Sequence, residues 1–318
     1  MIHFIRLIRP VNLLIIVATM YGLGWYYDLI FRINGSNESV LGSLDFFLLV
    51  ISTVMIAAAG NIINDYFDVK ADRVNRPNRL IITKHIKRRW AIVFHWTLNL
   101  LAFSIAIYLS IHQHTFWYVF IHLLSINVLW FYSMQLKRTI VAGNVVIGLL
   151  TASVSILVGI FFQDVFVGIK LTAVYPFSIQ SSSYFGIYLG IAFGVFAFIL
   201  NWTREIIKDM EDVQGDLLLK AKTLPIVLGI QKTRVLAVVF LLLSMTLSIP
   251  IIWFWKTGVI SGIAISPLLL SAIALIIALI LLLQPISKRR LRGVNHCLKL
   301  TMIFGMFLPL FWIYQILN

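Results

Sequence analysis

Long apolar segments alternate with short polar segments along almost the whole chain. Each apolar segment is close to the roughly 20 residues that a helix needs to cross about 30 Å of hydrocarbon. They lie at residues 11–31, 45–64, 90–111, 114–133, 140–163, 184–202, 234–254, 263–284 and 297–316. Their apolar residues run continuously and do not alternate with polar ones, which excludes a membrane β-barrel. The pattern therefore predicts an all-α integral membrane protein with nine transmembrane helices.

The composition supports a membrane protein and excludes other classes. Of the 318 residues, 60% are hydrophobic and 12% are charged, a charged fraction well below that of a typical soluble domain. The mean hydropathy is +0.95. Cys297 is the only cysteine, so an internal disulfide is impossible. Arg6 and Arg9 precede the first apolar segment as in a signal peptide, but no small-residue cleavage pattern follows, so we expect a retained first helix.

The positions of the basic residues predict the orientation of the chain. With a cytoplasmic amino terminus, the inside segments are 1–10, 65–89, 134–139, 203–233 and 285–296. Together with Arg234 and Lys299 at the adjoining helix ends, they hold 23 of the 26 Lys and Arg residues. Because basic residues concentrate on the cytoplasmic side, we expect the amino terminus inside and the carboxyl terminus outside. With no organellar targeting segment visible, a cell (inner) membrane is the expected location. Residues 164–183 then form the longest outside loop, to which we assign no function.

Acidic residues are rare, and most of them lie in two short segments. The chain has only 12 acids, and eight of them fall within residues 65–72 and 205–216. Asp65, Asp68 and Asp72 recur as Asp209, Asp212 and Asp216, each displaced by 144 residues, and Asn61 recurs as Glu205 at the same offset. Each set of acids follows an apolar segment directly, the second and the sixth in chain order.

The matched acids indicate an internal repeat. Each set would lie at the cytoplasmic end of the second helix of a four-helix unit. We therefore expect a single domain over 1–318, with one repeat over about 9–133, a second over about 140–284 and an added helix at 297–316. The two repeats would run parallel, in the same orientation.

The spacing of the acids favours a site for hard divalent cations. Acids three and four residues apart share one helix face at roughly 5–6 Å, where like charges repel unless cations neutralise them. Carboxylate oxygens without thiolates or paired imidazoles select Mg²⁺, Mn²⁺ or Ca²⁺ over zinc. The expected metal ligands are Asp65, Asp68, Asp72, Asp209, Asp212 and Asp216. Because Mg²⁺ shares its coordination with phosphate oxygens, we expect a diphosphate substrate. The alternative is that both acidic segments are solvated loop surfaces. That alternative does not explain why the acids of the two segments repeat at the same spacing.

Basic residues are interleaved with the acids, which suggests a binding site for a polyanion. They are Arg73, Arg76, Arg79, Lys137, Arg138, Arg204, Lys208, Lys220 and Lys222. For each of them the alternative is a role only in orienting the chain in the membrane. Lys137 is the preferred phosphate contact because its six-residue loop keeps it near the helix ends. Tyr132 lies beside it in sequence, and Asn12 is a polar residue at the apolar start of the first helix.

The two acidic segments resemble the aspartate-rich motifs of the UbiA superfamily of intramembrane prenyltransferases. Asn64-Asp65-Tyr66-Phe67-Asp68 with Asp72 resembles NDxxDxxxD, and Asp212-Val213-Gln214-Gly215-Asp216 resembles DxxxD. Further similar segments are Arg9-Pro10-Val11-Asn12, Tyr132-Ser133, Leu136-Lys137-Arg138, Gly143-Asn144 and Lys222-Thr223-Leu224-Pro225. The resemblance covers residues 9 to about 229.

The resemblance implies Mg²⁺-dependent transfer of a prenyl group from its diphosphate to a lipophilic acceptor at the cytoplasmic face. The motif acids would hold the Mg²⁺ and serve catalysis. The residues expected to bind substrate are Asn12, Asn61, Asn64, Arg76, Tyr132, Lys137, Arg138, Arg204, Lys208 and Lys222. Segments 72–79 and 204–212 are most similar to the branch that transfers a geranylgeranyl group to geranylgeranylglycerol phosphate. An aromatic acceptor, such as hydroxybenzoate or a quinone precursor, is the alternative.

A polyanion transporter is the non-enzymatic alternative, because intramembrane charges and internal repeats also describe secondary carriers. Carriers place their charges near the bilayer midplane, whereas the motif acids here fall at predicted helix ends. This depth favours an enzyme. Membrane lipids are expected partners and nucleic acid is not, because the net charge of +14 arises from short loops between membrane helices.

Overall fold

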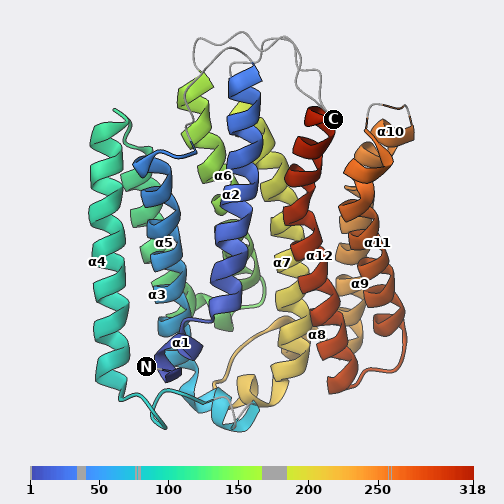
Figure 1. Cartoon of the computed structure of the whole chain (residues 1–318). Helices are drawn as coiled ribbons and strands as arrows, with labels where there is room; N and C mark the ends of the chain where they lie inside the picture. Colours follow the sequence, from blue (N-terminus) through green and yellow to red (C-terminus); the bar gives the residue numbers. More distant parts are fainter. Residues whose placement is uncertain are drawn as a thin grey trace. The chain divides into compact units, whose positions relative to one another are not determined.

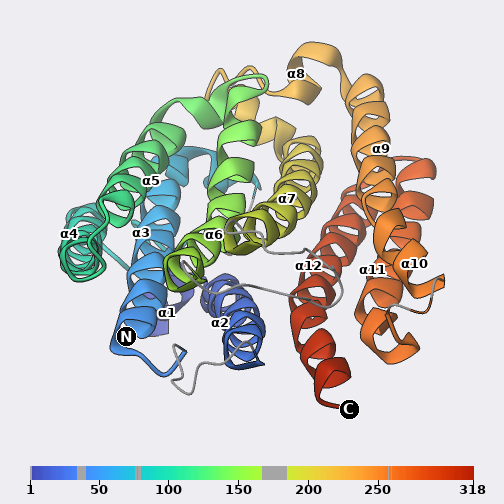
Figure 2. The ribbon, with the colours of Figure 1, turned by 90° about the horizontal axis from the view of Figure 1, so that it is seen from above.

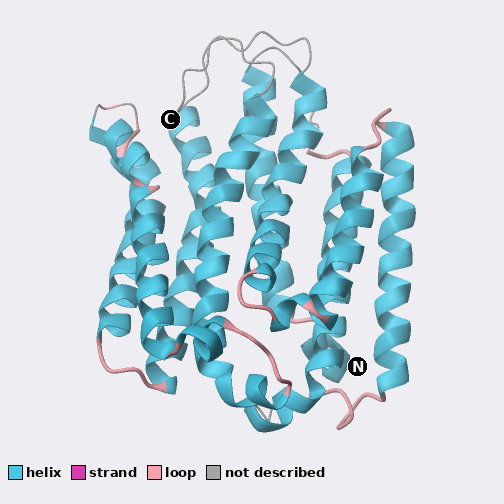
Figure 3. Cartoon of the chain, turned by 180° about the vertical axis from the view of Figure 1, so that it is seen from behind, coloured by secondary structure: helices cyan, strands magenta, loops and turns pink. Residues whose placement is uncertain are grey.

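The computed structural model describes residues 2–33, 41–75, 77, 80–166, 185–256, 258 and 260–318. Within these residues the secondary structure is helical, with loops and turns between the helices and no strand (Figure 3). The helices labelled in Figure 1 are α1 (Ile2–Leu7), α2 (Pro10–Ile33), α3 (Leu44–Asn75), α4 (Arg88–His112), α5 (Trp117–Met134), α6 (Ala142–Phe166), α7 (Phe185–Leu218), α8 (Leu224–Leu228), α9 (Ile230–Thr246), α10 (Ile249–Lys256), α11 (Gly262–Leu283) and α12 (Lys288–Leu317). A short 3-10 helix, η2 (Leu136–Arg138), follows α5.

The described residues contain nine helical segments that are long and apolar enough to cross a membrane. The prediction of an all-α membrane protein with nine spans is therefore confirmed. Large apolar side chains remain exposed along these segments, such as Leu100, Val235 and Ile276, which suits contact with lipid tails. The cytoplasmic position of the amino terminus stays a prediction, and the loop expected at 164–183 lies outside the described residues apart from the end of α6.

Helix α3 is longer than the membrane segment predicted at 45–64, because it continues to Asn75. Pro77 follows two residues later, and a proline ring prevents a helix from continuing through its position. The first acidic set is therefore held on the last turns of a continuous helix rather than in a loop.

Helix α7 likewise continues past the segment predicted at 184–202 and carries the second acidic set. It ends in a Schellman motif, in which Lys220 takes a left-handed φ of 53°. The N–H of Ala221 donates to the carbonyl of Asp216 at 3.0 Å, and the N–H of Lys220 donates to the carbonyl of Leu217 at 3.1 Å. These two bonds satisfy carbonyls that the end of the helix would otherwise leave without partners.

The seventh predicted span, 234–254, corresponds to a candidate membrane span over Ile230–Trp253, but the helix is interrupted within it. Helix α9 ends at Thr246, and α10 begins at Ile249. Pro250 explains this break, because its ring lacks an N–H and clashes with the carbonyl four residues earlier, which belongs to Thr246.

The chain folds into two compact units. Unit 1 comprises Met1–Val17, Ser43–Ile147 and Asp212–Ile230, and unit 2 comprises Ala18–Gly42, Gly148–Glu211 and Gln231–Asn318. The boundaries pass through α2, α6 and α7 and after the first residue of α9. These units are not the two sequence repeats, so the repeat organisation stays a prediction.

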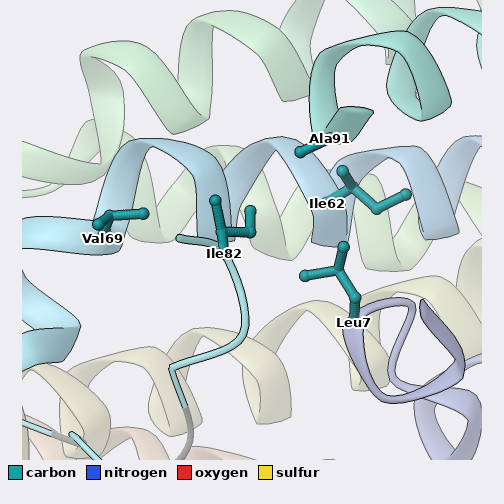
Figure 4. Close-up of a cluster of buried hydrophobic side chains, with 5 residues drawn as sticks. All are labelled: Leu7, Ile62, Val69, Ile82 and Ala91. Carbon is teal, nitrogen blue, oxygen red and sulfur yellow. The ribbon is translucent and has the colours of Figure 1, made fainter. Parts of the chain in front are cut away.

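Unit 1 is built around α3, α4 and α5, which lie side by side in two perpendicular views (Figures 1 and 2). Ile56, Ala102 and Ile126 form one cluster of buried side chains between them. A second cluster packs the short helix α1 against α3. Figure 4 shows its five members, Leu7, Ile62, Val69, Ile82 and Ala91, which come from α1, α3, the loop after α3 and the start of α4. This second cluster fixes the segment before Arg9 beside the acidic end of α3.

Unit 2 contains α9, α10, α11 and α12, and α11 packs closely along α12. Ser287 caps α12 by accepting a hydrogen bond from the N–H of Arg290 at 3.3 Å. The short link 284–287 therefore joins α11 and α12 as an antiparallel hairpin.

Candidate active site

The first acidic set lies along one face of the last three turns of α3. Asp65, Asp68 and Asp72 are three and four residues apart, so their side chains follow one another along the helix. Asp68 is 8% exposed, and Asp65 and Asp72 are half-buried. Like charges at this spacing repel, so neighbouring cations must stabilise this end of the helix.

Arg9 supplies one of these cations. It lies between α1 and α2, and its guanidinium makes an ion pair with the carboxylate of Asp65. Its backbone takes a left-handed φ of 56°, a conformation that most residues avoid. Asn61 fixes the same segment by donating to the carbonyl of Ile8 at 2.9 Å. The charge of Asp65 raises the pKa of Arg9, with smaller contributions from Asp68 and Asp72, so the guanidinium stays protonated.

Lys137 supplies the second cation. It lies in η2, directly after α5, and its ammonium group makes an ion pair with the carboxylate of Asp68. The same ammonium donates to the Asn64 side-chain oxygen at 3.2 Å. The structure thus brings together Asn64, Asp68 and Lys137, three residues that the sequence assigned to one site. Contact between Lys137 and a phosphate stays a prediction.

The second acidic set is divided between the two units. Asp212 and Asp216 belong to unit 1 with the first set, and Asp209 belongs to unit 2. Asn75, the last residue of α3, connects the two sets within unit 1. Its side-chain amide donates to the carbonyl of Asp212 at 3.0 Å, and its oxygen accepts from the N–H of Gly215 at 3.0 Å.

This contact requires a glycine in α7. A Cβ atom at position 215 would lie 2.2 Å from the Asn75 amide nitrogen and 3.0 Å from the carbonyl of Ala71. A residue with a Cβ atom at position 215 would therefore displace the Asn75 side chain and crowd the carbonyl of Ala71. The glycine inside the second motif is therefore explained by the close approach of the two helices.

The loop after α7 reaches η2. The N–H of Lys222 donates to the carbonyl of Arg138 at 2.8 Å, and the hydroxyl of Thr223 lies 3.5 Å from a carboxylate oxygen of Asp216. The Lys222 side chain is exposed and that of Arg138 is half-buried. Two predicted substrate contacts therefore come from adjacent stretches of backbone beside the second set of acids.

Other predicted site residues have different surroundings. In unit 2, Arg204 donates to Asn295 at 3.0 Å and to Asn201 at 3.3 Å, and Lys208 pairs with Glu205 at 3.1 Å. In unit 1, Tyr132 is buried at 5% exposure in α5, and Asn12 is half-buried in the first turn of α2. Arg76 lies outside the described residues. Substrate contacts by these residues stay predictions.

The oxygen donors at the ends of α3 and α7 have the chemistry that Mg²⁺ requires. Within the described residues, no three His, Cys, Asp or Glu side chains are gathered closely enough to enclose a metal ion. Mg²⁺ does not depend on such a cage, because it is usually bound by one or two carboxylates together with waters and substrate phosphates. The donor set fits Mg²⁺, and its coordination by the six motif acids stays a prediction.

Two residues of this site were not among the predicted contacts. Arg9 is part of the segment Arg9-Pro10-Val11-Asn12, which resembles the family. Its position before Pro10, at the start of an apolar segment, was the sequence feature that indicated a role in the site. Asn75 lies three residues after Asp72, on the same helix face as the motif. Two features of the sequence indicated a contact between the helices. They are the polar amide of Asn75 on that face and Gly215 within the second motif.

The chain is similar to a known protein family and to known proteins over most of its length. The model of the UbiA prenyltransferase family matches residues 29–303. A digeranylgeranylglyceryl phosphate synthase from Methanothermobacter thermautotrophicus is 30% identical over 301 residues, which cover 94% of this chain and 92% of the relative.

Solved structures share the fold. A structure described as a digeranylgeranylglyceryl phosphate synthase in membranes has a TM-score of 0.63 at 24% identity and covers 98% of both chains. A UbiA homolog from Archaeoglobus fulgidus bound to GPP and Mg²⁺ has a TM-score of 0.51 at 18% identity, covering 96% of this chain and 99% of that one. The family match over most of the sequence supports an enzyme rather than a carrier. The chain therefore belongs to the UbiA prenyltransferase family.

Proposed function

We propose that this prenyltransferase transfers a geranylgeranyl group from geranylgeranyl diphosphate to geranylgeranylglycerol phosphate. The name of the Methanothermobacter thermautotrophicus relative supports this substrate pair, because that protein matches almost the whole chain. The similarity of segments 72–79 and 204–212 to the same branch points to the same acceptor. Membrane lipids would surround the spanning helices.

The observation that carries the proposal is the pairing of acids and cations at the end of α3. Asp65 is paired with Arg9, and Asp68 is paired with Lys137 beside Asn64. A diphosphate group needs both kinds of charge, because carboxylates bind it only through metal ions and cationic side chains bind its oxygens directly. Asn75 attaches this cluster to the backbone that carries Asp212.

The reaction breaks the bond between the allylic carbon of the prenyl chain and a diphosphate oxygen, whose electron pair leaves with the diphosphate. A bond forms between that carbon and the hydroxyl oxygen of the acceptor, and the hydroxyl proton is released. Lys137 and Arg9 would bind oxygens of the departing diphosphate and stabilise its developing charge. Asp65, Asp68, Asp72, Asp209, Asp212 and Asp216 would hold Mg²⁺. When bound, Mg²⁺ would neutralise further negative charge on the leaving group.

The use of Mg²⁺ is supported by chemistry and by a structural neighbour. The motif acids provide hard oxygen donors, and the Archaeoglobus fulgidus homolog was solved with GPP and Mg²⁺. We place the site at the cytoplasmic face of a cell membrane, because 23 of the 26 Lys and Arg residues fall in segments on that side of the predicted topology.

A transfer assay on the purified protein tests the proposal. Labelled geranylgeranyl diphosphate and Mg²⁺ are incubated with geranylgeranylglycerol phosphate in one reaction and with 4-hydroxybenzoate in another. The expected result is a lipid-ether product in the first reaction only, abolished by EDTA and restored by Mg²⁺. Product only in the second reaction would replace the lipid acceptor with an aromatic one. Turnover that resists EDTA would contradict the role of the metal.

A further inference from the structure

A second charged site lies in unit 2, where α11 and α12 meet. A cavity of about 460 Å³ lies at the end of this hairpin and is lined by Leu281, Ser287, Arg289, Arg290 and Gly293. Neither the acidic motifs nor their cationic partners contribute to it. Leu281 belongs to the last turn of α11, and the other four residues belong to the start of α12 and its cap.

Two guanidinium groups give this cavity a positive wall. Arg290 is held in place because its guanidinium donates to the carbonyl of Pro285 at 2.6 Å, which occupies one of its five donors. Arg289 is exposed, and within the described residues no hydrogen bond or ion pair engages its side chain. None of the described residues lining the cavity is acidic. Both charges are therefore available to an anion.

Among the described residues, an ion pair of α12 lies at Arg292 rather than at the two arginines of this wall. Glu211 pairs with Arg292 at 2.8 Å. At the helix terminus, Ser287 accepts the N–H of Arg290, which satisfies one of the first N–H groups of α12. The anion affinity of the cavity would thus come from Arg289 and Arg290.

Leu281 gives the cavity an apolar part that lies next to Gly293. A Cβ atom at position 293 would lie 3.0 Å from a methyl group of Leu281, so a larger residue there would crowd a side chain that lines the cavity. Beyond Leu281, the outer face of α11 exposes Ile277, Ile280 and Leu283. A positive end next to an exposed apolar helix face matches a molecule with a charged head and a hydrocarbon tail.

We propose that this cavity binds the phosphate headgroup of an anionic membrane phospholipid. Arg289 and Arg290 would hold the phosphate, Ser287 would supply a hydroxyl, and an acyl chain would lie along α11. The cavity lies at the ends of two helices that span the membrane, which is the depth of lipid headgroups. The proposal does not depend on the transfer reaction. The phosphate of the prenyl acceptor has the same chemistry, so the test must separate the two sources.

The test measures binding of phosphatidylglycerol to the full chain by native mass spectrometry in mixed phosphatidylcholine and phosphatidylglycerol micelles. The double variant Arg289→Gln/Arg290→Gln should bind phosphatidylglycerol roughly tenfold or more weakly, because each basic residue near a charged membrane contributes about 1 kcal/mol. The control Lys84→Gln/Lys87→Gln removes the same charge from exposed positions elsewhere and should bind like the wild type. Equal losses in both double variants, or no loss in either, would overturn the proposal.

A second variant tests the cavity without changing the charge. Gly293→Val should reduce phosphatidylglycerol binding while both arginines remain. Retained binding in this folded variant would show that no cavity is involved. If Gly293→Val does not fold, Arg289→Gln/Arg290→Gln still tests whether the cavity binds phospholipid. This double variant is expected to fold, because Arg289 is exposed and Arg290 is partly exposed.

A competition arm distinguishes the two phosphates. Geranylgeranylglycerol phosphate should leave phosphatidylglycerol bound, and Arg289→Gln/Arg290→Gln should leave the apparent KM for this acceptor unchanged. Displacement of the phospholipid together with a raised acceptor KM in the double variant would assign the cavity to the acceptor and overturn the lipid assignment.

Discussion

Asp68 and Lys137 show at the scale of single residues how the site is assembled. The carboxylate of Asp68 is nearly buried and makes an ion pair with the adjacent ammonium of Lys137. The same ammonium donates a hydrogen bond to the side-chain oxygen of Asn64 at 3.2 Å. This second contact fixes the position of the ammonium. A phosphate that binds here would find a cation already oriented.

Replacing Lys137 with alanine should weaken binding of prenyl diphosphate roughly tenfold or more. A hydrogen bond to a charged group contributes about 1.5–3 kcal/mol, and each 1.4 kcal/mol corresponds to a factor of ten in affinity. The measurement is the apparent KM for geranylgeranyl diphosphate at saturating acceptor. Lys137→Arg should recover part of the loss, and Lys84→Ala, which removes an exposed charge, should have no effect. An unchanged KM for Lys137→Ala would show that this lysine does not bind the diphosphate and only helps to orient the chain in the membrane.

Asn75 and Gly215 form a coupled pair, which a double-mutant cycle can measure. Asn75→Ala removes two hydrogen bonds and should lower the free energy of unfolding by about 1–3 kcal/mol. Gly215→Ala should be more harmful, because its Cβ would overlap the Asn75 amide. That overlap disappears in the double variant, so the two effects should not add. Thermal unfolding in detergent and kcat for transfer provide the readouts.

Strict additivity in this cycle would contradict the proposed contact. A fall in kcat with an unchanged KM for Asn75→Ala would support its role in positioning the second acidic set. An unchanged kcat would leave Asn75 with a role in stability alone.

The sequence predicted most of the acids and cations of the site but not how they are paired. The spacing of Asp65, Asp68 and Asp72 on one helix face could be derived from helical periodicity. The partner of each acid depends on tertiary contacts that periodicity does not encode. Arg9 reaches Asp65 across 56 positions in the sequence, and Asn75 reaches α7 across 137.

At the scale of elements, α1 is a short helix that depends on its contacts. Its Leu7 is fully buried in the cluster shown in Figure 4, and Phe4 packs against Phe94 of α4 with ring centroids 4.6 Å apart. His3 stacks on His85 of the loop after α3 at 3.8 Å. Since α1 leads directly into Arg9, docking of α1 helps to hold the Arg9 guanidinium at Asp65.

Docking of α1 should weaken as the pH falls below about 6.5. Partial burial lowers the pKa of His3 below its ordinary value, and the charges of His85 and Arg6 lower it further. The folded state therefore binds this proton less readily than the unfolded state. The stabilisation is present above the ordinary pKa and is lost as the pH falls through the lowered one.

Hydrogen exchange of residues 2–9 tests this prediction. Protection should be lower at pH 5.5 than at pH 7.5 in the wild type. The variant His3→Gln removes the titrating group and should show little change between the two pH values. Equal protection of the wild type at both pH values would contradict a pH-dependent contact.

The helices themselves could largely be predicted from apolar length, whereas their ends could not. Length and hydropathy identify spans, but α3 and α7 continue into polar sequence because helical propensity and tertiary contacts persist there. Pro250 was visible in the sequence, yet a proline in a membrane helix is often tolerated, so the break after α9 needed the structure.

At the scale of the whole molecule, the distribution of charge determines how the chain is expected to lie in its membrane. The acidic motifs and most bases occupy one set of alternating segments, which predicts that they share one side. The two compact units do not correspond to the sequence repeats, since unit 1 combines the first acidic set with Asp212 and Asp216 of the second. Unit 1 thus contains acids of both sets, and the repeat organisation stays a prediction.

The predicted orientation can be tested by labelling introduced cysteines, because Cys297 is the single native cysteine and can be replaced. In a Cys297→Ser background, Lys87→Cys should react with a membrane-impermeant maleimide in inside-out vesicles and not in sealed right-side-out vesicles. Lys256→Cys, on the predicted outer side, should show the reverse. The opposite labelling pattern would invert the topology and place the acidic motifs outside.

The most direct test of the proposed site is Mg²⁺-dependent binding of geranylgeranyl diphosphate to the purified chain, measured calorimetrically without acceptor. The wild type should bind the diphosphate in the presence of Mg²⁺ and lose most of its affinity in EDTA. Asp68→Asn and Asp212→Asn, which preserve side-chain size, should each remove the dependence on Mg²⁺ while the protein remains folded. Tight binding that is equal with and without Mg²⁺, or unchanged in both variants, would contradict a diphosphate site formed by the two acidic motifs.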